Sequence, residues 1–242
     1  MSQPPDYRAD ASTYLSNRQA LRALEQEDKL LSAVYYSFVS LLAAGTAFFS
    51  PSGVLALPPM WLLLRRTNKV NQIHRSMTAL LDTFDLQGGE LIPRLTIPGQ
   101  GSLDLFARFP SKHWFAIALR SQGKSTIFYN EAKEAIYIRR QQGGKGLNQW
   151  TPDHIQRLSD QEFWLRRNQI DLFGKSSRDK RRPLVKLLVL TGQTRLGKHP
   201  EHLYANIGNQ KVLLLRKRAS VYVLEEEQLT DFVKAWLAPQ PQ

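Results

Sequence analysis

The feature that most constrains this chain is a stretch at residues 30–64 that contains no charged side chain. A transmembrane helix needs only about 20 apolar residues, and so long an uncharged stretch is unusual for a buried helix. The sequence Ser-Pro-Ser-Gly at residues 50–53 divides it into apolar segments at 30–49 and 54–64. The pattern therefore predicts a transmembrane helical hairpin over residues 30–64, with a single pass, or a buried helical hairpin inside a soluble protein, as the alternatives.

Basic residues flank this stretch on both sides, whereas the segment between the two apolar parts has no charge. The flanking cations are Arg18, Arg22 and Lys29 before it, and Arg65, Arg66, Lys69 and Arg75 after it. Segments rich in Lys and Arg stay on the cytoplasmic side of a membrane. The sequence thus predicts an integral membrane protein whose N-terminus and C-terminal domain both lie in the cytoplasm.

The chain divides into three parts on this interpretation. Residues 1–29 are expected to form a disordered tail and a short amphipathic helix, residues 30–64 the hairpin, and residues 65–242 a basic folded domain. The formal net charge is +12, and the excess of cations lies in the last part. Such an excess favours a polyanion, either nucleic acid or an anionic lipid surface. The absence of cysteine excludes disulfides, thiolate metal sites and cysteine nucleophiles.

The hydrophobic pattern of residues 65–242 predicts an α/β (α+β) domain, a mixed β-sheet flanked by helices. Helices are expected at 70–84, 153–168 and 225–236. Strands are expected at 91–97, 102–109, 114–119, 184–190, 212–215 and 221–224, with an antiparallel pair at 125–129 and 134–139.

Two of these segments carry a family resemblance. Residues 101–105 read Gly-Ser-Leu-Asp-Leu, and residues 114–120 read Trp-Phe-Ala-Ile-Ala-Leu-Arg, with Gly123-Lys124 beyond. Together with the order of helices and strands over about residues 75–237, they resemble the nuclease-related domain family. This family is a branch of the restriction-endonuclease-like (PD-(D/E)XK) fold, so the resemblance implies that fold for the domain.

The resemblance also implies where an active centre would lie. In such folds an Asp on one strand and a Glu-x-Lys on the next hold a divalent metal and activate water. Asp104 occupies the first position, but Ala118-Leu119-Arg120 stands where the pattern has Glu-x-Lys. Alanine cannot bind a metal, and arginine is not deprotonated at any relevant pH. The resemblance therefore implies a non-catalytic remnant, Asp104 and Arg120, with no metal and no cofactor; an active metal-dependent nuclease is the alternative.

Basic clusters offer a second kind of candidate site. The main one is expected to bind polyanions and comprises Arg166, Arg167, Lys175, Arg178, Lys180, Arg181 and Arg182. Phe163 and Trp164 precede it and are expected to lie in the core side of a helix. Residues 192–198 match the first seven positions of a phosphate-binding P-loop, but His199 stands in place of the Ser or Thr. We interpret that segment as a basic loop.

The sequence as a whole predicts a membrane-anchored, non-catalytic interaction or assembly module at the cytoplasmic membrane surface. Membrane lipids and a membrane-protein partner are its expected partners, and no small-molecule substrate is expected. A membrane-associated nuclease or a nucleic-acid-binding tether is the alternative.

Overall fold

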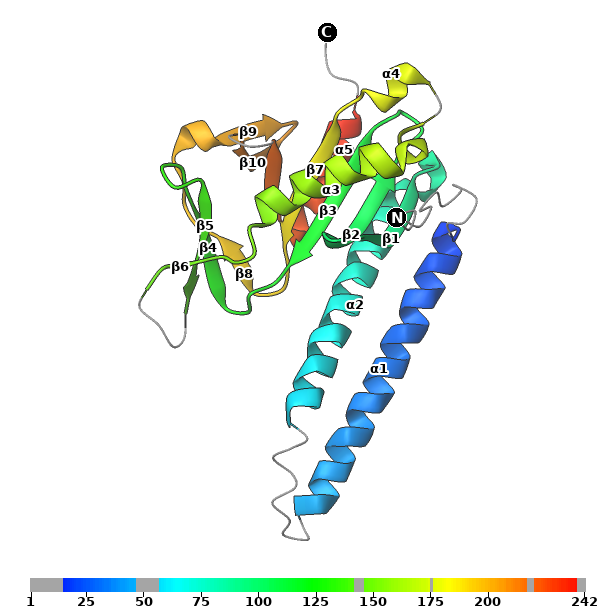
Figure 1. Ribbon diagram of the computed structural model, residues 1–242, viewed down its shortest axis with the longest axis vertical. Coiled ribbons are helices and arrows are strands. Elements are labelled where there is room, and N and C mark those ends of the chain that lie inside the picture. The colour runs from blue at the N-terminus through cyan, green and yellow to red at the C-terminus, as the bar shows by residue number, and fades with distance from the viewer. Residues whose placement is uncertain (1–14, 47–56, 142–145, 175, 217–219, 239–242) are drawn as a thin grey trace, which may run out of the picture.

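A computed structural model describes residues 15–46, 57–141, 146–174, 176–216 and 220–238 (Figure 1). Two β-sheets and five α-helices make up these residues, so the prediction of a mixed α/β architecture is confirmed at that level. The helices are α1 (Asn17–Thr46), α2 (Leu57–Phe84), α3 (His154–Asn168), α4 (Ser177–Lys180) and α5 (Leu229–Leu237). Short 3-10 turns are η3 (Asp85–Gln87), η4 (Ile170–Phe173), η5 (Glu201–Leu203) and η6 (Glu226–Gln228).

The larger sheet has seven strands in the order β1-β2-β3-β7-β11-β10-β9. Their bounds are β1 (Glu90–Ile97), β2 (Gly101–Arg108), β3 (Trp114–Arg120), β7 (Leu184–Leu190), β9 (Tyr204–Ile207), β10 (Gln210–Leu215) and β11 (Val221–Glu225). β3, β7 and β11 run parallel in the middle, and the strands on either side are antiparallel. The carboxyl ends of three neighbouring strands therefore meet at one edge of the sheet.

The smaller sheet has the order β6-β5-β4-β8, with β4 (Ser125–Asn130), β5 (Ala135–Arg140), β6 (Asn148–Gln149) and β8 (Thr194–Leu196). The expected antiparallel pair around Asn130 is confirmed as β4 and β5. The P-loop-like segment contains the strand β8, which pairs in parallel with β4, and the element that follows it is the short 3-10 turn η5 and not an α-helix. The Gly197 amide donates to the Ile127 carbonyl at 2.8 Å, as part of this pairing.

Both faces of the large sheet are covered, and each has its own apolar core (Figure 1). α2, α5 and the first half of α1 pack on one face, where Met77, Phe115 and Phe232 are buried. α3 and the smaller sheet pack on the other, where Leu158 and Ile127 are buried. Every residue of β7 is buried because it lies in the middle of the sheet with both faces covered, which explains its continuously apolar sequence apart from one lysine.

The two long N-terminal helices lie side by side and extend beyond the sheet (Figure 1). α1 is fixed to the domain at its start, where the Asn17 side chain donates to the Gly89 carbonyl at 2.6 Å and accepts from the Leu91 amide at 2.8 Å. Further along, Leu24 and Leu31 of α1 are buried in the same core as Ile73 of α2. The predicted amphipathic helix is thus the first half of a much longer one.

The predicted transmembrane hairpin of residues 30–64 is wrong for the described part of the chain. No helix there combines the length and the apolar character needed to cross a bilayer. The integral-membrane localisation derived from the hairpin, with both ends in the cytoplasm, is wrong for the same reason.

The described parts of the uncharged stretch, residues 30–46 and 57–64, instead belong to two helices that both continue into charged segments. Glu27, in the charged half of α1, accepts a hydrogen bond from Arg66 of α2 at 3.0 Å and forms an ion pair with Arg94 of β1. The expected division between residues 64 and 65 falls inside α2. The expected turn at 50–53 and the expected disordered tail at 1–14 lie outside the described residues.

Candidate anion-binding site

A cleft of about 970 Å³ lies at the sheet edge where β3 and β7 end, with α2 as its other wall. Ligands of α/β proteins commonly bind outside the carboxyl ends of parallel strands. The lining residues come from α2, from the end of β3 with the loop after it, and from the loop after β7. They are Arg65, Asn68, Lys69, Asn71, Gln72, Arg75, Leu119, Arg120, Ser121, Gln122, Gly123, Gly192 and Gln193.

Asp104 of β2 lies beneath the cleft and is only 2% exposed. Its Oδ2 accepts from the Leu119 amide at 2.7 Å and from the Lys69 ammonium at 2.8 Å, and it also forms an ion pair with Arg120. The carboxylate therefore holds two cations of the cleft lining, one from a helix and one from a strand.

Burial lowers the pKa of the Lys69 ammonium to about 8; the Arg120 charge acts in the same direction, and Asp104 opposes both. Lys69 is therefore charged at pH 7 and loses its proton under mildly alkaline conditions.

His154 supports Arg120 from the opposite face of the sheet. Its Nδ1 faces the Arg120 Nε at 3.3 Å, and its ring packs edge-on against Trp150. Burial, with the Arg120 charge in addition, lowers the pKa of His154 to about 3. The imidazole is neutral near pH 7, and its Nδ1 can accept the guanidinium hydrogen bond.

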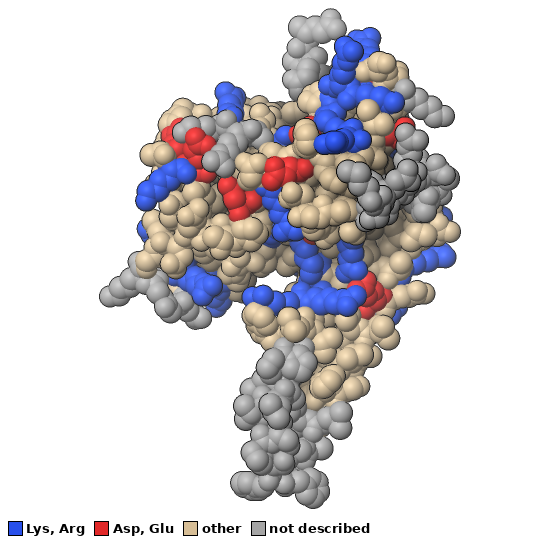
Figure 2. Space-filling model, in the orientation of Figure 1, with Lys and Arg blue, Asp and Glu red and all other residues tan. Residues whose placement is uncertain are grey.

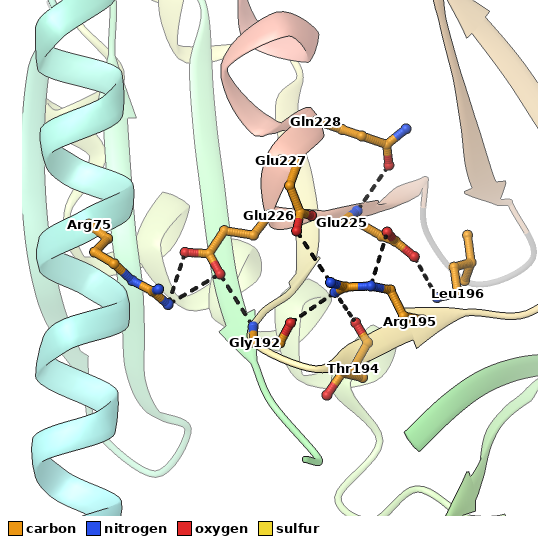
Figure 3. Close-up of polar contacts among 9 residues, drawn as sticks. All are labelled: Arg75, Gly192, Thr194, Arg195, Leu196, Glu225, Glu226, Glu227 and Gln228. Atoms are coloured by element: carbon orange, nitrogen blue, oxygen red, sulfur yellow. Dashed lines mark hydrogen bonds and ion pairs between the residues drawn. The ribbon is translucent and has the colours of Figure 1, made fainter. Parts of the chain in front are cut away.

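The rim of the cleft carries two further arginines, Arg65 and Arg75, of which Figure 3 shows Arg75. Arg75 forms an ion pair with Glu226 at 3.2 Å, and Glu226 also accepts from the Gly192 amide at 3.3 Å. Arg65 stacks on the ring of Trp61, with its guanidinium carbon 3.4 Å from the ring centroid. Glu226 thus joins α2 to the loop after β7.

The same loop is fixed from behind by a second arginine (Figure 3). Arg195 donates to the Gly192 carbonyl at 2.8 Å and forms an ion pair with Glu227 at 3.5 Å. The Leu196 amide donates to Glu225 at 2.9 Å. These contacts hold the wall of the cleft in place and leave Arg195 outside the residues that line it.

The charged residues that line the cleft are all basic. Four cations, Arg65, Lys69, Arg75 and Arg120, face a cleft whose lining contains no Asp or Glu among the described residues. The amides of asparagine and glutamine supply most of the remaining polar groups, and Leu119 is the one large apolar residue. Cations and amide N–H groups together are the donors that bind phosphate oxygens.

The residues around Asp104 do not fit a catalytic metal. Mg²⁺ is held by oxygen ligands, whereas the nearest charged neighbours of this carboxylate are Lys69 and Arg120. Ala118 is buried and offers no ligand atom. Within the described ranges, no three His, Asp or Glu side chains come together as a metal site would require.

The structure brings Asp104 and Arg120 together, as the resemblance implied, and adds Lys69, which sequence reasoning missed as a site residue. Lys69 had been interpreted as a charge that flanks a membrane segment. The signal that could have found it is the helical spacing of Arg65, Lys69, Gln72 and Arg75, which lie on one face of α2.

The predicted polyanion-binding cluster lies elsewhere, at the sheet edge where β3 and β7 begin. Arg166 is not a surface contact: it donates to the carbonyls of Lys180 at 2.8 Å and Arg182 at 2.7 Å and lies over the Phe173 ring. Arg182 is 3.7 Å from Asp179, and Lys175 lies outside the described residues. The exposed arginines of the cluster are Arg167, Arg178 and Arg181.

Comparison with known proteins gives no relative for this chain. Neither a scan of protein-family models nor searches of curated proteins and of solved structures produced a match. The function therefore has to be argued from the geometry.

Proposed function

We propose that this chain is a non-catalytic nucleic-acid-binding module whose cleft receives the sugar-phosphate backbone. The observation that carries the proposal is the set of four cations, without a lining carboxylate, at the carboxyl ends of β3 and β7. A protein interface normally has an apolar centre, and Leu119 alone does not provide one.

The nuclease-like resemblance supports the same proposal. On this resemblance α2, β1, β2, β3, α3 and β7 would form the nuclease-like core, and they follow one another along the chain with β4, β5 and β6 between β3 and α3. In a nuclease of this type the metal would lie between Asp104 and the position of Ala118. Lys69 and Arg120 now surround Asp104, so that the centre offers positive charge where a nuclease would hold a metal ion. Such a site retains affinity for a phosphodiester without the means to cleave it.

The full chain is expected to bind labelled oligonucleotides with an affinity that falls steeply with salt. Each phosphate contact adds about −0.7 to −0.9 to the slope of log K against log salt, so two to four contacts give a slope between about −1.4 and about −3.6. Fluorescence anisotropy at several salt concentrations measures this slope. Incubation of the same oligonucleotide with Mg²⁺ or Mn²⁺ is expected to leave it intact.

A matched pair of variants locates the binding site. Arg65→Gln combined with Arg75→Gln removes two cations from the cleft and is expected to weaken binding about tenfold and to flatten the slope by about 2. Arg18→Gln combined with Arg22→Gln removes the same charge from the exposed surface of α1 and is expected to change little. Equal effects of the two pairs would show that net charge, rather than the cleft, binds nucleic acid.

Affinity is also expected to fall between pH 7 and pH 9, because the pKa of Lys69 is about 8. Below this pKa the ammonium attracts phosphate, and above it the neutral amine does not. Loss of one charge pair at ~4 Å in water corresponds to about 1 kcal/mol, or about fivefold in affinity. An adenine-only oligonucleotide is the suitable probe because its bases do not titrate in this range.

Lys69→Arg is the control for this pH dependence. An arginine keeps its charge throughout the range, so the affinity of this variant is expected to be flat from pH 7 to pH 9. If the variant shows the same fall as the natural protein, a group other than Lys69 is responsible.

A further inference from the structure

Phe163 is the most exposed aromatic residue of α3. Its side chain is 69% exposed, whereas Ile155, Leu158 and Leu165 of the same helix are buried in the core. The sequence-based expectation that Phe163 lies on the core side of this helix is wrong, because the buried stripe of α3 passes on the other side of the helix. Trp164, the next residue, is partly buried and packs against the core as expected.

Exposed arginines lie on the last turn of α3 and in the α4 segment beside it. Arg167 is one turn further along α3, on the same face as Phe163. Arg166 binds the backbone carbonyls of Lys180 and Arg182, which brings α4 and the residues after it beside the last turn of α3. Arg178 and Arg181 are therefore neighbours of this helix end. Figure 2 shows Lys and Arg side chains gathered over α4.

Two of the four acidic residues nearby are already paired with other cations. Asp179 is committed to Lys112 and Arg182, and Glu162 to Arg166 and Lys186. Asp160 accepts from Gln156 one turn before Phe163, and Asp171 is exposed in η4. Three exposed arginines thus accompany one exposed aromatic ring at the last turn of α3 and on the neighbouring α4 segment. We call Phe163, Arg167, Arg178 and Arg181 the α3–α4 surface.

We propose that the α3–α4 surface binds single-stranded nucleic acid, with a base stacked on Phe163 and phosphates held by the arginines. The proposal rests on the proposed function and adds the form of nucleic acid that is bound. Stacking of a base on an aromatic side chain contributes about 1–3 kcal/mol and requires a base whose face is free. The bases of a duplex already stack on each other, so only an unpaired strand offers that face.

The spacing between the cleft and the α3–α4 surface allows one single-stranded nucleic acid to contact both. The cleft lies at the carboxyl end of β3, and α4 lies near its amino end, where Lys112 pairs with Asp179. A seven-residue strand such as β3 spans about 23 Å. Single-strand-binding domains cover about 4–16 nucleotides, a range that includes strands able to cross this distance.

The test uses the full chain and three probes of equal length, about 16 nucleotides, the upper site size of one single-strand-binding domain. The probes are a thymine-only single strand, the same strand with abasic sugars, and a duplex. Phe163→Ala is expected to weaken binding of the thymine strand about fivefold to a hundredfold, the range measured for loss of one stacked base, and to leave the other two probes unchanged. Phe163→Trp is expected to retain the affinity.

Tyr36→Ala is the matched control, because Tyr36 is an equally exposed aromatic residue, 68%, on α1. It is expected to change none of the three affinities. If Phe163→Ala binds the thymine strand as the natural protein does, or loses all three probes alike, the inference about the α3–α4 surface is overturned. If the natural protein binds none of the probes at low salt, the proposed function itself fails. If only the Arg65/Arg75 double variant loses binding, the cleft stands as the binding site and the inference about the α3–α4 surface is overturned.

Discussion

Asp104→Ala is expected to lower the free energy of unfolding by about 3–5 kcal/mol, the usual cost of removing one partner from a buried ion pair. The carboxylate is 2% exposed and is shared by Lys69 and Arg120, so its loss leaves two cations facing each other without a counter-charge. The Leu119 amide also loses its acceptor. Urea denaturation followed by tryptophan fluorescence measures the change.

Asp104→Asn separates the contribution of the negative charge from that of the hydrogen bond to the Leu119 amide. Asparagine keeps an oxygen that accepts from the Leu119 amide but carries no charge, so we expect a smaller destabilisation than with alanine. In whichever variant stays folded, Lys69 loses the carboxylate that favours its charged form, so the pKa of Lys69 is expected to fall and the affinity of the cleft for an oligonucleotide at pH 7 is expected to fall with it. An unchanged affinity in a stable variant would contradict the role that we assign to this carboxylate.

Glu162→Ala is expected to destabilise the fold to a similar extent, about 3–5 kcal/mol. Lys186 lies in the central strand β7 and is only 8% exposed; its ammonium forms an ion pair with Glu162 of α3. Glu162 also accepts from Arg166 at 2.9 Å. Truncation therefore leaves a buried ammonium unpaired and loosens the arginine that holds α4. Thermal and urea denaturation both measure the effect.

Removing the buried lysine together with the carboxylate is expected to restore most of the lost stability. Glu162→Gln combined with Lys186→Met replaces the ion pair by an amide, which still accepts from Arg166, and by an apolar side chain of similar length. Glu201→Ala serves as the comparison, because its partner Lys211 is 50% exposed and such pairs contribute about 0–1 kcal/mol. Equal losses in Glu162→Ala and Glu201→Ala would mean that Lys186 is hydrated in solution.

The regular elements of the domain were accessible from sequence because their apolar patterns report burial directly. The continuously apolar strand at 114–119 and the strand at 184–190, apolar except for Lys186, occupy the centre of the large sheet, where both faces are covered. β8 was missed because Thr194–Leu196 has only three residues and no alternating pattern. The prediction from the uncharged stretch at 30–64 was wrong because the stretch was interpreted as one unit. Its two ends belong to two helices that continue into charged segments.

The candidate site was only partly accessible for a related reason. Asp104 and Arg120 lie on adjacent strands of one antiparallel hairpin, so a short sequence pattern could relate them. Lys69 and His154 reach the same place from helices far away in the chain, and nothing in their local sequence reports that contact. The exposure of Phe163 likewise depends on which side of α3 the sheet covers.

The pairing of β4 with β8 has a consequence for how this protein can change over evolution. β3 leads through one cleft loop into β4, and β7 leads through the other into β8, so the two parallel pairs β3–β7 and β4–β8 close a ring through both loops. An insertion in one loop alone would shift the register of β4 against β8, so that Ile127 no longer pairs with Leu196 and a buried side chain turns outward. The lengths of the two loops therefore depend on each other. A relative in which one of these loops is longer or shorter is expected to show a matching change of length in the other loop.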